Sequence, residues 1–189
     1  MRLFHLSDLH IGKRVNEFSM IEDQKYILER ILDLAEKEMP DGVILAGDIY
    51  DKQIPSAEAV QVFDEFITKL AERKFPVFVI SGNHDSAERL AFGGRLLNSR
   101  GIYLSPVYDG TVMKIPIADQ YGTVWIHLLP FIRPAAVRRV FEDESDLITD
   151  VQSAVRAVIS HMEIDPNERN ILVAHQFVTG ASRCESEDI

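Results

Sequence analysis

The sequence predicts an α/β protein in which buried strands alternate with amphipathic helices. Short apolar runs of strand length alternate along the chain with longer segments whose apolar residues recur at helical spacing. Clusters of acidic residues, histidines and one asparagine directly follow four of the apolar runs. Because open α/β sheets place their sites at the carboxyl ends of strands, we expect these clusters to converge if the four strands share one sheet.

The first half of the chain contains three predicted strands and two predicted helices. The strands are the apolar runs at residues 2–6, 43–46 and 77–80. A helix is expected over residues 21–38, where apolar residues recur at helical spacing: Ile27, Ile31, Leu34 and Ala35, with Leu28 and Leu32 widening the stripe. A second helix should begin after Ser56, its N-cap, and form one apolar face from Val60, Phe63, Ile67 and Leu70.

The second half of the chain is predicted to form another sheet. Residues 87–98 are expected to be helical, with an interruption at two adjacent glycines. Residues 102–129 contain short β-rich pieces, separated by two pairs typical of antiparallel hairpins: Asp109-Gly110 and Tyr121-Gly122. An amphipathic helix is expected over residues 147–162, followed by a last strand at residues 171–174.

Composition limits the class of protein. The 189 residues are 46% hydrophobic, enough for one domain with a substantial core, or nearly all of one. The formal net charge of −10 argues against a broad nucleic-acid-binding surface, although carboxylates that hold cations would account for part of it. The single cysteine, Cys184, favours a reducing compartment. Without a bilayer-length apolar run or a signal-peptide pattern, we expect a cytoplasmic protein with no membrane partner.

The first two polar clusters supply carboxylate and imidazole groups. Asp8 and His10 would lie on the same side of an extended backbone and could together grip one ion. Asp48 follows Gly47, where the chain can turn sharply, and its two carboxylate oxygens could bridge two ions. Each cluster alone is also explained by a turn, with a surface histidine in the first case and an Asx turn or helix cap in the second.

The third cluster, Gly82-Asn83-His84-Asp85, is more specific than the first two. Asn83 offers a neutral carbonyl oxygen to a hard cation, His84 offers a titratable imidazole, and Asp85 could hold His84 in one tautomer. His175 follows the fourth apolar run, and beside the other clusters it is better interpreted as a ligand than as a half-buried side chain. Converging carboxylates, an amide oxygen and imidazoles predict bound divalent metal.

The remaining histidines are expected to have structural roles. His5 and His127 lie within apolar strands, and His161 lies near a helix end. None of the three is therefore expected to complete the metal site.

The motifs resemble those of the calcineurin-like metallophosphoesterases, which carry Asp-x-His, Gly-Asp-x-x-Asp and Gly-Asn-His-Asp/Glu motifs followed by later histidines. Five segments resemble, more narrowly, the SbcD-type nuclease subunits of bacteria, counterparts of the Mre nuclease: residues 6–12, 46–51, 81–86, 129–134 and 174–181. The first three segments specify the superfamily, and the last two point to the narrower family. The resemblance spans essentially the whole chain and implies a sandwich of two mixed β-sheets flanked by helices.

The resemblance assigns a role to each cluster residue. Asp8 and His10 would hold one divalent ion, and Asp48 would bridge it to a second. Asn83 and His175 would hold the second ion. The family favours manganese, with magnesium as the alternative, and the mixed oxygen and imidazole donors are compatible with either.

The resemblance also implies which residues would meet the substrate. His84 would face the scissile phosphate and protonate the departing sugar oxygen, with Asp85 behind it as the second catalytic residue. Four basic residues are candidate DNA contacts, with solvated surface charges as the alternative interpretation: Lys13, Arg14, Arg89 and Arg133.

Partners and completeness follow from the same resemblance. The family implies DNA as substrate, an SbcC-type ATPase as partner, and a homodimer through helices at residues 56–73 and 86–100. It completes its site with a downstream Gly-His-x-His motif, which these 189 residues do not contain. We therefore expect residues 1–189 to be the N-terminal part of the nuclease domain, truncated at the C-terminus before that motif and before the capping domain.

Three functions are compatible with the sequence. The leading hypothesis is a two-metal DNA nuclease subunit, acting as a double-strand exonuclease and single-strand endonuclease in DNA repair and recombination. The second is a small-substrate phosphoesterase, such as a phosphatase or cyclic-nucleotide phosphodiesterase, that uses the same two-ion chemistry. The third is an inactive fragment that acts only as a scaffold, because catalysis depends on the geometry that the missing histidines would complete.

Overall fold

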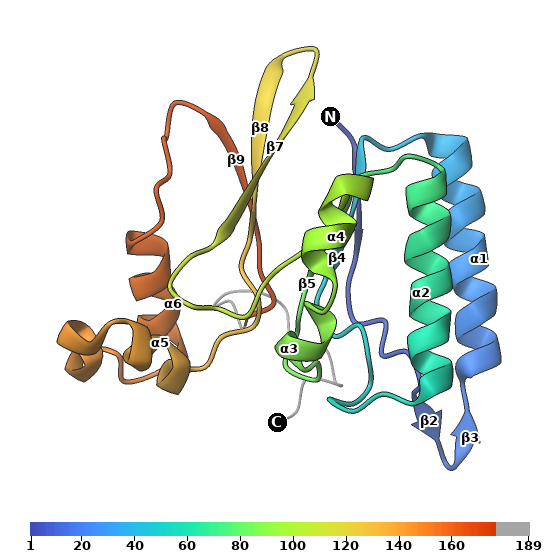
Figure 1. The fold of residues 1–189 in the computed structure, drawn as a ribbon, viewed down its shortest axis with the longest axis horizontal. Helices are drawn as coiled ribbons and strands as arrows, with labels where there is room; N and C mark the ends of the chain where they lie inside the picture. Colours follow the sequence, from blue (N-terminus) through green and yellow to red (C-terminus); the bar gives the residue numbers. More distant parts are fainter. Residues whose placement is uncertain (177–189) are drawn as a thin grey trace.

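Two β-sheets pack face to face in the computed structural model, which describes residues 1–176 (Figure 1). The first sheet is parallel, with the order β1 (Leu3–Leu6), β4 (Gly42–Ala46), β5 (Val77–Ile80) and β6 (Ile102–Leu104). The second sheet is mixed: β7 (Met113–Asp119) is antiparallel to β8 (Gly122–Leu128), which is parallel to β9 (Arg169–Val173). The predicted α/β class and the two-sheet sandwich are confirmed, but within residues 1–176 the first sheet is parallel rather than mixed.

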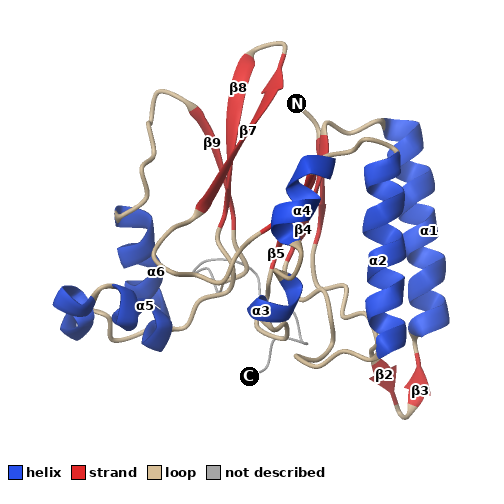
Figure 2. Cartoon of the chain, in the orientation of Figure 1, coloured by secondary structure: helices blue, strands red, loops and turns tan. Residues whose placement is uncertain are grey.

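The apolar core consists of three clusters of buried residues. The inner faces of both sheets share one cluster, in which Ile44 and Phe78 of the first sheet meet Ile126 and Val173 of the second. Helices α1 (Ile21–Glu38) and α2 (Ala57–Glu72) cover the outer face of the first sheet (Figure 2). Helices α5 (Pro134–Val140) and α6 (Val151–Ser160) form a third cluster with the segment that follows β8.

Both long helices occur where the sequence predicts them, but α1 turns a different face inward. Leu28, Leu32 and Ala35 are buried, whereas Ile27 and Leu34 are 52% and 48% exposed. Two adjacent apolar rows run along this helix, and only packing against α2 and the sheet decides which row is covered. The predicted cap of α2 is confirmed, because the amide of Ala59 donates to Ser56 Oγ at 3.2 Å.

Two strands belong to a different sheet from the one expected. Residues 102–104 form β6 in the first sheet, reached through α3 (Ala87–Leu90), α4 (Gly94–Leu97) and the 3₁₀ helix η1 (Asn98–Arg100). A helical crossover of this kind is what joins parallel neighbours. The strand before His175 is β9 of the second sheet, so the four clusters do not share one sheet. Their convergence depends instead on the packing of the two sheets.

Several smaller elements were not expected. A hairpin of β2 (Arg14–Val15) and β3 (Phe18–Ser19) follows the first cluster, and the 3₁₀ helix η2 (Glu142–Leu147) precedes α6. The α6 helix begins later than expected, because the carboxylate of Asp150 accepts the amide of Ser153 at 2.7 Å in a capping box.

The histidines outside the polar clusters are placed as expected in two cases. His127 is buried, and its Nε2 lies 2.9 Å from Asn170 Oδ1. His161 ends α6 and stacks on Phe141. His5 is an exposed side chain of β1 rather than a buried one. Cys184, like residues 177–181 of the fifth resembling segment, lies outside the described residues. Among the helices of residues 1–176, none has the length and apolar character needed to cross a membrane.

An ion pair joins the two edge strands of the second sheet. Arg169 at the start of β9 reaches Asp119 at the end of β7 with two bonds, of 2.7 and 3.1 Å. It also donates to the carbonyl of Gly122 at 2.6 Å. The Arg169 guanidinium holds the pKa of Asp119 well below its ordinary range. This charge-assisted clamp fixes the far end of the sheet that carries His175.

We expect Asp119→Asn to destabilise the protein at pH 7 and to lose this effect in acid. The folded pKa is depressed, so the stabilisation is present above the unfolded value of about 4 and disappears as pH falls through the folded pKa. Urea unfolding from pH 7 down to pH 3 measures the difference, with Asp146→Asn, an exposed residue of η2, as the control. A constant difference across this range would contradict the prediction.

Candidate metal centre

Three of the predicted ligands adopt backbone conformations that are rare for residues with side chains. Asp8, His10 and Asp48 have φ angles of 57°, 43° and 49°. The expectation of an extended backbone at Asp8 and His10 is therefore wrong: β1 ends at Leu6, and the chain turns at both residues. His10 Nε2 nevertheless lies 3.9 Å from Asp8 Oδ1. Such outliers cluster where surrounding structure holds a functional site in place.

Backbone hydrogen bonds hold these turns together beyond the ends of the strands. The amide of Asp8 donates to the carbonyl of Gly47 at 3.1 Å, and that of His10 donates to the carbonyl of Asp48 at 2.9 Å. The amide of Ile11 continues the series to Ile49 at 2.9 Å. The loops after β1 and β4 thus form one rigid platform for three of the ligands.

Two glycines of the motifs allow close approach between elements. A Cβ on Gly47, whose φ is 90°, would lie 2.6 Å from the ring of His175. A Cβ on Gly82 would lie 2.1 Å from Asp48 Oδ1. Neither position has room for a side chain, because a ligand from another strand occupies the space.

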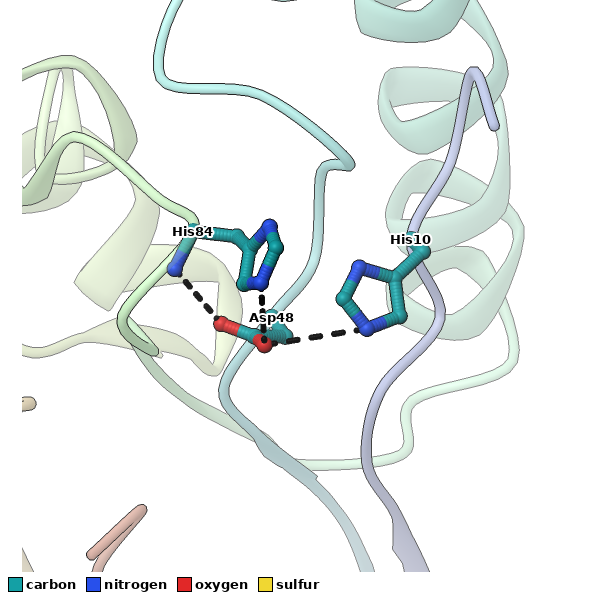
Figure 3. Close-up of side chains that lie close together, drawn as sticks. All are labelled: His10, Asp48 and His84. Atoms are coloured by element: carbon teal, nitrogen blue, oxygen red, sulfur yellow. Dashed lines mark hydrogen bonds and ion pairs between the residues drawn. The ribbon is translucent and has the colours of Figure 1, made fainter. Parts of the chain in front are cut away.

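Asp48 is the centre of the cluster. Its side chain is buried, and Oδ2 lies 3.5 Å from His175 Nε2, 3.7 Å from His10 Nε2 and 4.0 Å from His84 Nε2. Figure 3 shows the rings of His10 and His84 next to the carboxylate, whose Oδ1 accepts the His84 amide at 2.9 Å. Burial raises the pKa of Asp48, but the bonds from His175 and from the His84 amide outweigh it, so the pKa is lowered.

His175 is oriented as a ligand would be. Its Nδ1 lies 2.7 Å from the carbonyl of Ala46, so the Nδ1 proton is donated there. Its Nε2 then faces two oxygens, Asn83 Oδ1 at 3.1 Å and Asp48 Oδ2 at 3.5 Å. The Nε2 lone pair of His175 and the two oxygens are all acceptors, so a cation must lie between them, either a proton or a metal ion. Burial lowers the pKa of His175, but Asp48 and the Ala46 carbonyl outweigh burial, so the pKa is raised.

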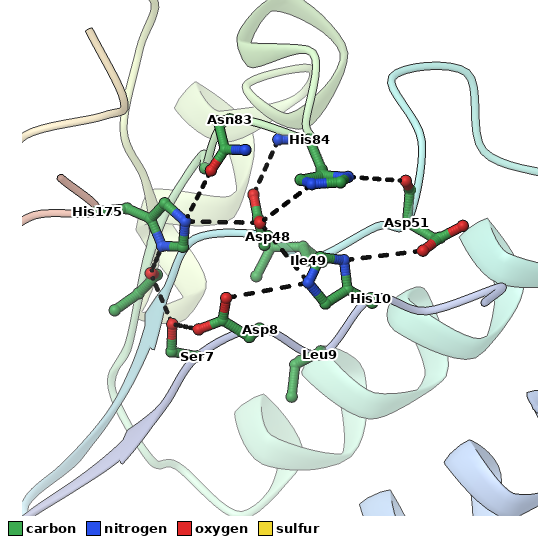
Figure 4. A network of polar contacts seen from close by, with 12 residues as sticks. Ser7, Asp8, Leu9, His10, Asp48, Ile49, Asp51, Asn83, His84 and His175 are labelled. Carbon is green, nitrogen blue, oxygen red and sulfur yellow. Dashed lines mark hydrogen bonds and ion pairs between the residues drawn. The ribbon is translucent and has the colours of Figure 1, made fainter. Parts of the chain in front are cut away.

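The donor atoms form two groups that share Asp48. Ligand atoms of His10, Asp48 and His84 lie within 4.8 Å of one another, as do those of Asp8, Asp48 and His175 (Figure 4). Carboxylate, imidazole and amide donors suit a divalent cation such as Mn²⁺. The residues present therefore fit a metal centre. His84 lies closer to the donor atoms than expected for a residue that only meets the substrate.

The expected contact between Asp85 and His84 is not formed. The carboxylate of Asp85 instead accepts three backbone amides, those of Gly82 at 2.8 Å, Tyr50 at 2.9 Å and Ile49 at 3.1 Å. Asp85 is buried where these amides need an acceptor, so it joins the loop after β4 to the loop after β5. Burial raises the pKa of Asp85 and outweighs the opposing effect of the amides.

Asp51, rather than Asp85, contacts the imidazole of His84. Its backbone carbonyl lies 3.1 Å from His84 Nδ1, and its Oδ1 lies 3.8 Å from His10 Nδ1. Asp51 is the last residue of the Gly-Asp-x-x-Asp motif, and this place in the motif is the sequence signal that could have identified it. Ser7 was also missed; its hydroxyl contacts the Asp8 carboxylate and lies 3.2 Å from the Ala46 carbonyl.

Gln24 of α1 supports the turn that carries His10. Its Nε2 lies 2.8 Å from the carbonyl of His10 and 3.1 Å from that of Leu9, and its Oε1 accepts the amide of Gly12 at 2.9 Å. One side chain thus satisfies three backbone groups of a strained loop. A glutamine in the first turn of an amphipathic helix gives no sequence signal for such a role.

The candidate DNA contacts are all exposed side chains, and they lie on three different parts of the chain. Lys13 and Arg14 lie at the β2–β3 hairpin, Arg89 lies in α3, and Arg133 directly precedes α5. Arg14 contacts the carbonyl of Glu17 within its own hairpin. Their exposure fits either solvated charges or contacts to a polyanion.

Fold and donor set together define a class: an α/β sandwich with a candidate divalent-metal centre built from strand ends of both sheets. The chain belongs to the calcineurin-like phosphoesterase family, which it matches over residues 1–189. It is 35% identical over 190 residues to the proteins named as the SbcD component of nuclease SbcCD from Staphylococcus epidermidis and from Staphylococcus saprophyticus. Each match covers 99% of this chain and 49% of the relative, so the chain spans about half the length of these relatives.

We expect Gln24→Ala to weaken Mn²⁺ binding by about tenfold or more, as loss of a ligand-orienting partner does. The carbonyls of Leu9 and His10 lose their donor, so the turn at His10 relaxes. Titration calorimetry with Mn²⁺ measures the affinity, and Gln61→Ala, an exposed glutamine of α2, is the control. Unchanged affinity in a folded Gln24→Ala protein would show that the turn holds without this side chain.

Proposed function

We propose that this chain is the metal-binding part of a cytoplasmic DNA nuclease subunit that hydrolyses phosphodiester bonds. In this proposal the protein acts as a double-strand exonuclease and single-strand endonuclease, with an SbcC-type ATPase as partner, in DNA repair and recombination. The observation that carries it is the convergence of donors from both sheets on Asp48. The two relatives named as nuclease components, whose matches cover 99% of the chain, support the choice of a nucleic acid as substrate.

The metal ligands in this proposal divide between two ions. By the family resemblance, Asp8 and His10 would hold one ion, Asn83 and His175 would hold the other, and Asp48 would be shared. The side chains lie near one another in different groups, Asp8 with His175 and His10 with His84. When bound, two Mn²⁺ or Mg²⁺ ions supply an activated water and neutralise charge on the phosphate. Ala46 keeps the Nδ1 proton of His175 in place, so Nε2 remains the ligand atom.

His84 is the proposed proton donor. Its side chain is 45% exposed, so substrate can reach it. The Asp51 carbonyl accepts the Nδ1 proton, and the protonated ring then presents Nε2–H toward the metal centre. This proton passes to the departing sugar oxygen. Asp85 contributes indirectly, because it holds the loop that carries His84.

We expect His84→Ala in the full-length protein to lower Mn²⁺-dependent cleavage of linear DNA by about 10²–10⁴-fold, the usual contribution of a general acid. Mn²⁺ binding should persist, and His5→Ala, an exposed histidine of β1, should cleave normally. Nuclease assays and Mn²⁺ titration measure the two effects.

Other outcomes of this experiment identify the alternatives. Loss of Mn²⁺ binding in His84→Ala would make His84 a ligand beside His10 and Asp48. Faster hydrolysis of an aryl phosphate than of DNA would favour a small-substrate phosphoesterase. Absence of any cleavage at saturating Mn²⁺ would favour a scaffold.

We also propose a homodimer through α2 and the segment from α3 to η1, residues 56–73 and 86–100. Phe92 and Leu96 of this segment are 87% and 80% exposed, and Val60 of α2 is 45% exposed. Exposed apolar side chains of this size mark contact surfaces when they gather.

We expect Leu96→Asp to convert the full-length dimer to a monomer, because a carboxylate cannot be buried unpaired at an apolar interface. Light scattering after gel filtration measures the mass. Tyr121→Asp, in the β7–β8 turn and 75% exposed, is the matched control and should remain dimeric. A monomeric native protein would contradict the proposal.

A further inference from the structure

The carboxylate of Asp8 is less buried than its neighbours in the metal centre. Its side chain is 58% exposed, against 4% for Asp48 and 16% for His175, the two residues with which it forms a donor group. An exposed carboxylate turns freely unless a neighbour holds it, and fixing such a side chain on binding lowers affinity. A residue that holds Asp8 in advance would therefore strengthen metal binding.

Ser7 holds this carboxylate from the preceding position in the chain. Its hydroxyl donates to Asp8 Oδ2, and a hydrogen bond to a charged acceptor is stronger than one between neutral groups. Within residues 1–176, no other side chain donates a hydrogen bond to Asp8. Oδ1 stays outside this bond and lies 3.9 Å from His10 Nε2, so one oxygen is held and the other is left for a cation.

The Ser7 hydroxyl also lies beside the carbonyl that orients His175. Ser7 Oγ is 3.2 Å from the carbonyl oxygen of Ala46, the last residue of β4, and His175 Nδ1 is 2.7 Å from the same oxygen. The hydroxyl carries one proton, and the charged carboxylate of Asp8 is the stronger of its two acceptors. Ser7 thus contacts one member of the donor group, Asp8, and the support of another, His175 (Figure 4).

The histidines of the other donor group, His10 and His84, have separate supports. Gln24 Nε2 donates to the carbonyl of His10 at 2.8 Å, and the carbonyl of Asp51 lies 3.1 Å from His84 Nδ1. Among the described residues, Ser7 forms no hydrogen bond with either histidine. A change at Ser7 should therefore weaken the binding of the ion that Asp8 contacts and spare the other ion.

We propose that Ser7 is a positioning residue, whose hydroxyl holds the Asp8 carboxylate with one oxygen turned toward the donor group of Asp48 and His175. The proposal rests on the metal centre of the proposed function and deepens it, because it adds a residue that binds neither metal nor substrate. Its effect is on the affinity for one divalent ion, so it is measured without any cleavage.

The test compares Ser7→Ala and Ser7→Thr with the native full-length protein by titration calorimetry with MnCl₂. Ser7→Ala should raise the Kd of one of the two Mn²⁺ ions about tenfold or more, as loss of a ligand-orienting partner does, and leave the other Kd unchanged. Ser7→Thr keeps the hydroxyl and should bind both ions as the native protein does. The matched control is Ser160→Ala, which removes a hydroxyl that donates to the carbonyl of Ala157 at 2.8 Å within α6, and both Kd values should stay the same.

A second measurement separates positioning from a general loss of structure. Crystal structures of the metal-free native and Ser7→Ala proteins should differ in the side-chain rotamer of Asp8 and agree in the backbone from Leu6 to His10. Thermal unfolding of the metal-free proteins should give the same Tm for both, because the exposed carboxylate contributes little to stability.

Unchanged Kd values for both ions in Ser7→Ala would overturn the proposal and leave the nuclease function standing. An equal loss of affinity in Ser7→Thr would also overturn it, because the hydroxyl would then not be the cause. A native full-length protein that binds two Mn²⁺ ions but cleaves no DNA would overturn the proposed function and leave the role of Ser7 standing.

Discussion

The buried carboxylate of Asp48 is the interaction on which the site depends. Its oxygens face the imidazoles of His10, His84 and His175, which come from three different loops. A buried charge must be paired. Here the partners are the backbone amide of His84 and the three imidazoles, each of which can carry a proton or bind a metal ion. The same carboxylate thus requires positive charge at this point. A metal ion or a protonated histidine meets that requirement.

The rest of the platform serves to hold strained turns in place. Asp8, His10 and Asp48 adopt left-handed conformations, which backbone bonds between the loops after β1 and β4 stabilise. Gln24 satisfies the carbonyls of the first turn, and Asp85 satisfies three amides of the others. Rigid supports of this kind keep ligand geometry within the narrow limits that metal chemistry needs.

The sequence by itself determined the α/β class, both long helices, the cap at Ser56 and the residues that gather at the site. Local periodicity and motif spacing report these directly, because they depend on neighbours in the chain. Only the tertiary structure decided that His175 comes from the second sheet, that Leu28 rather than Ile27 faces the core, and that Asp85 binds amides instead of His84. Those outcomes depend on which surfaces pack together and which buried amides need an acceptor, and the order of residues along the chain does not specify either.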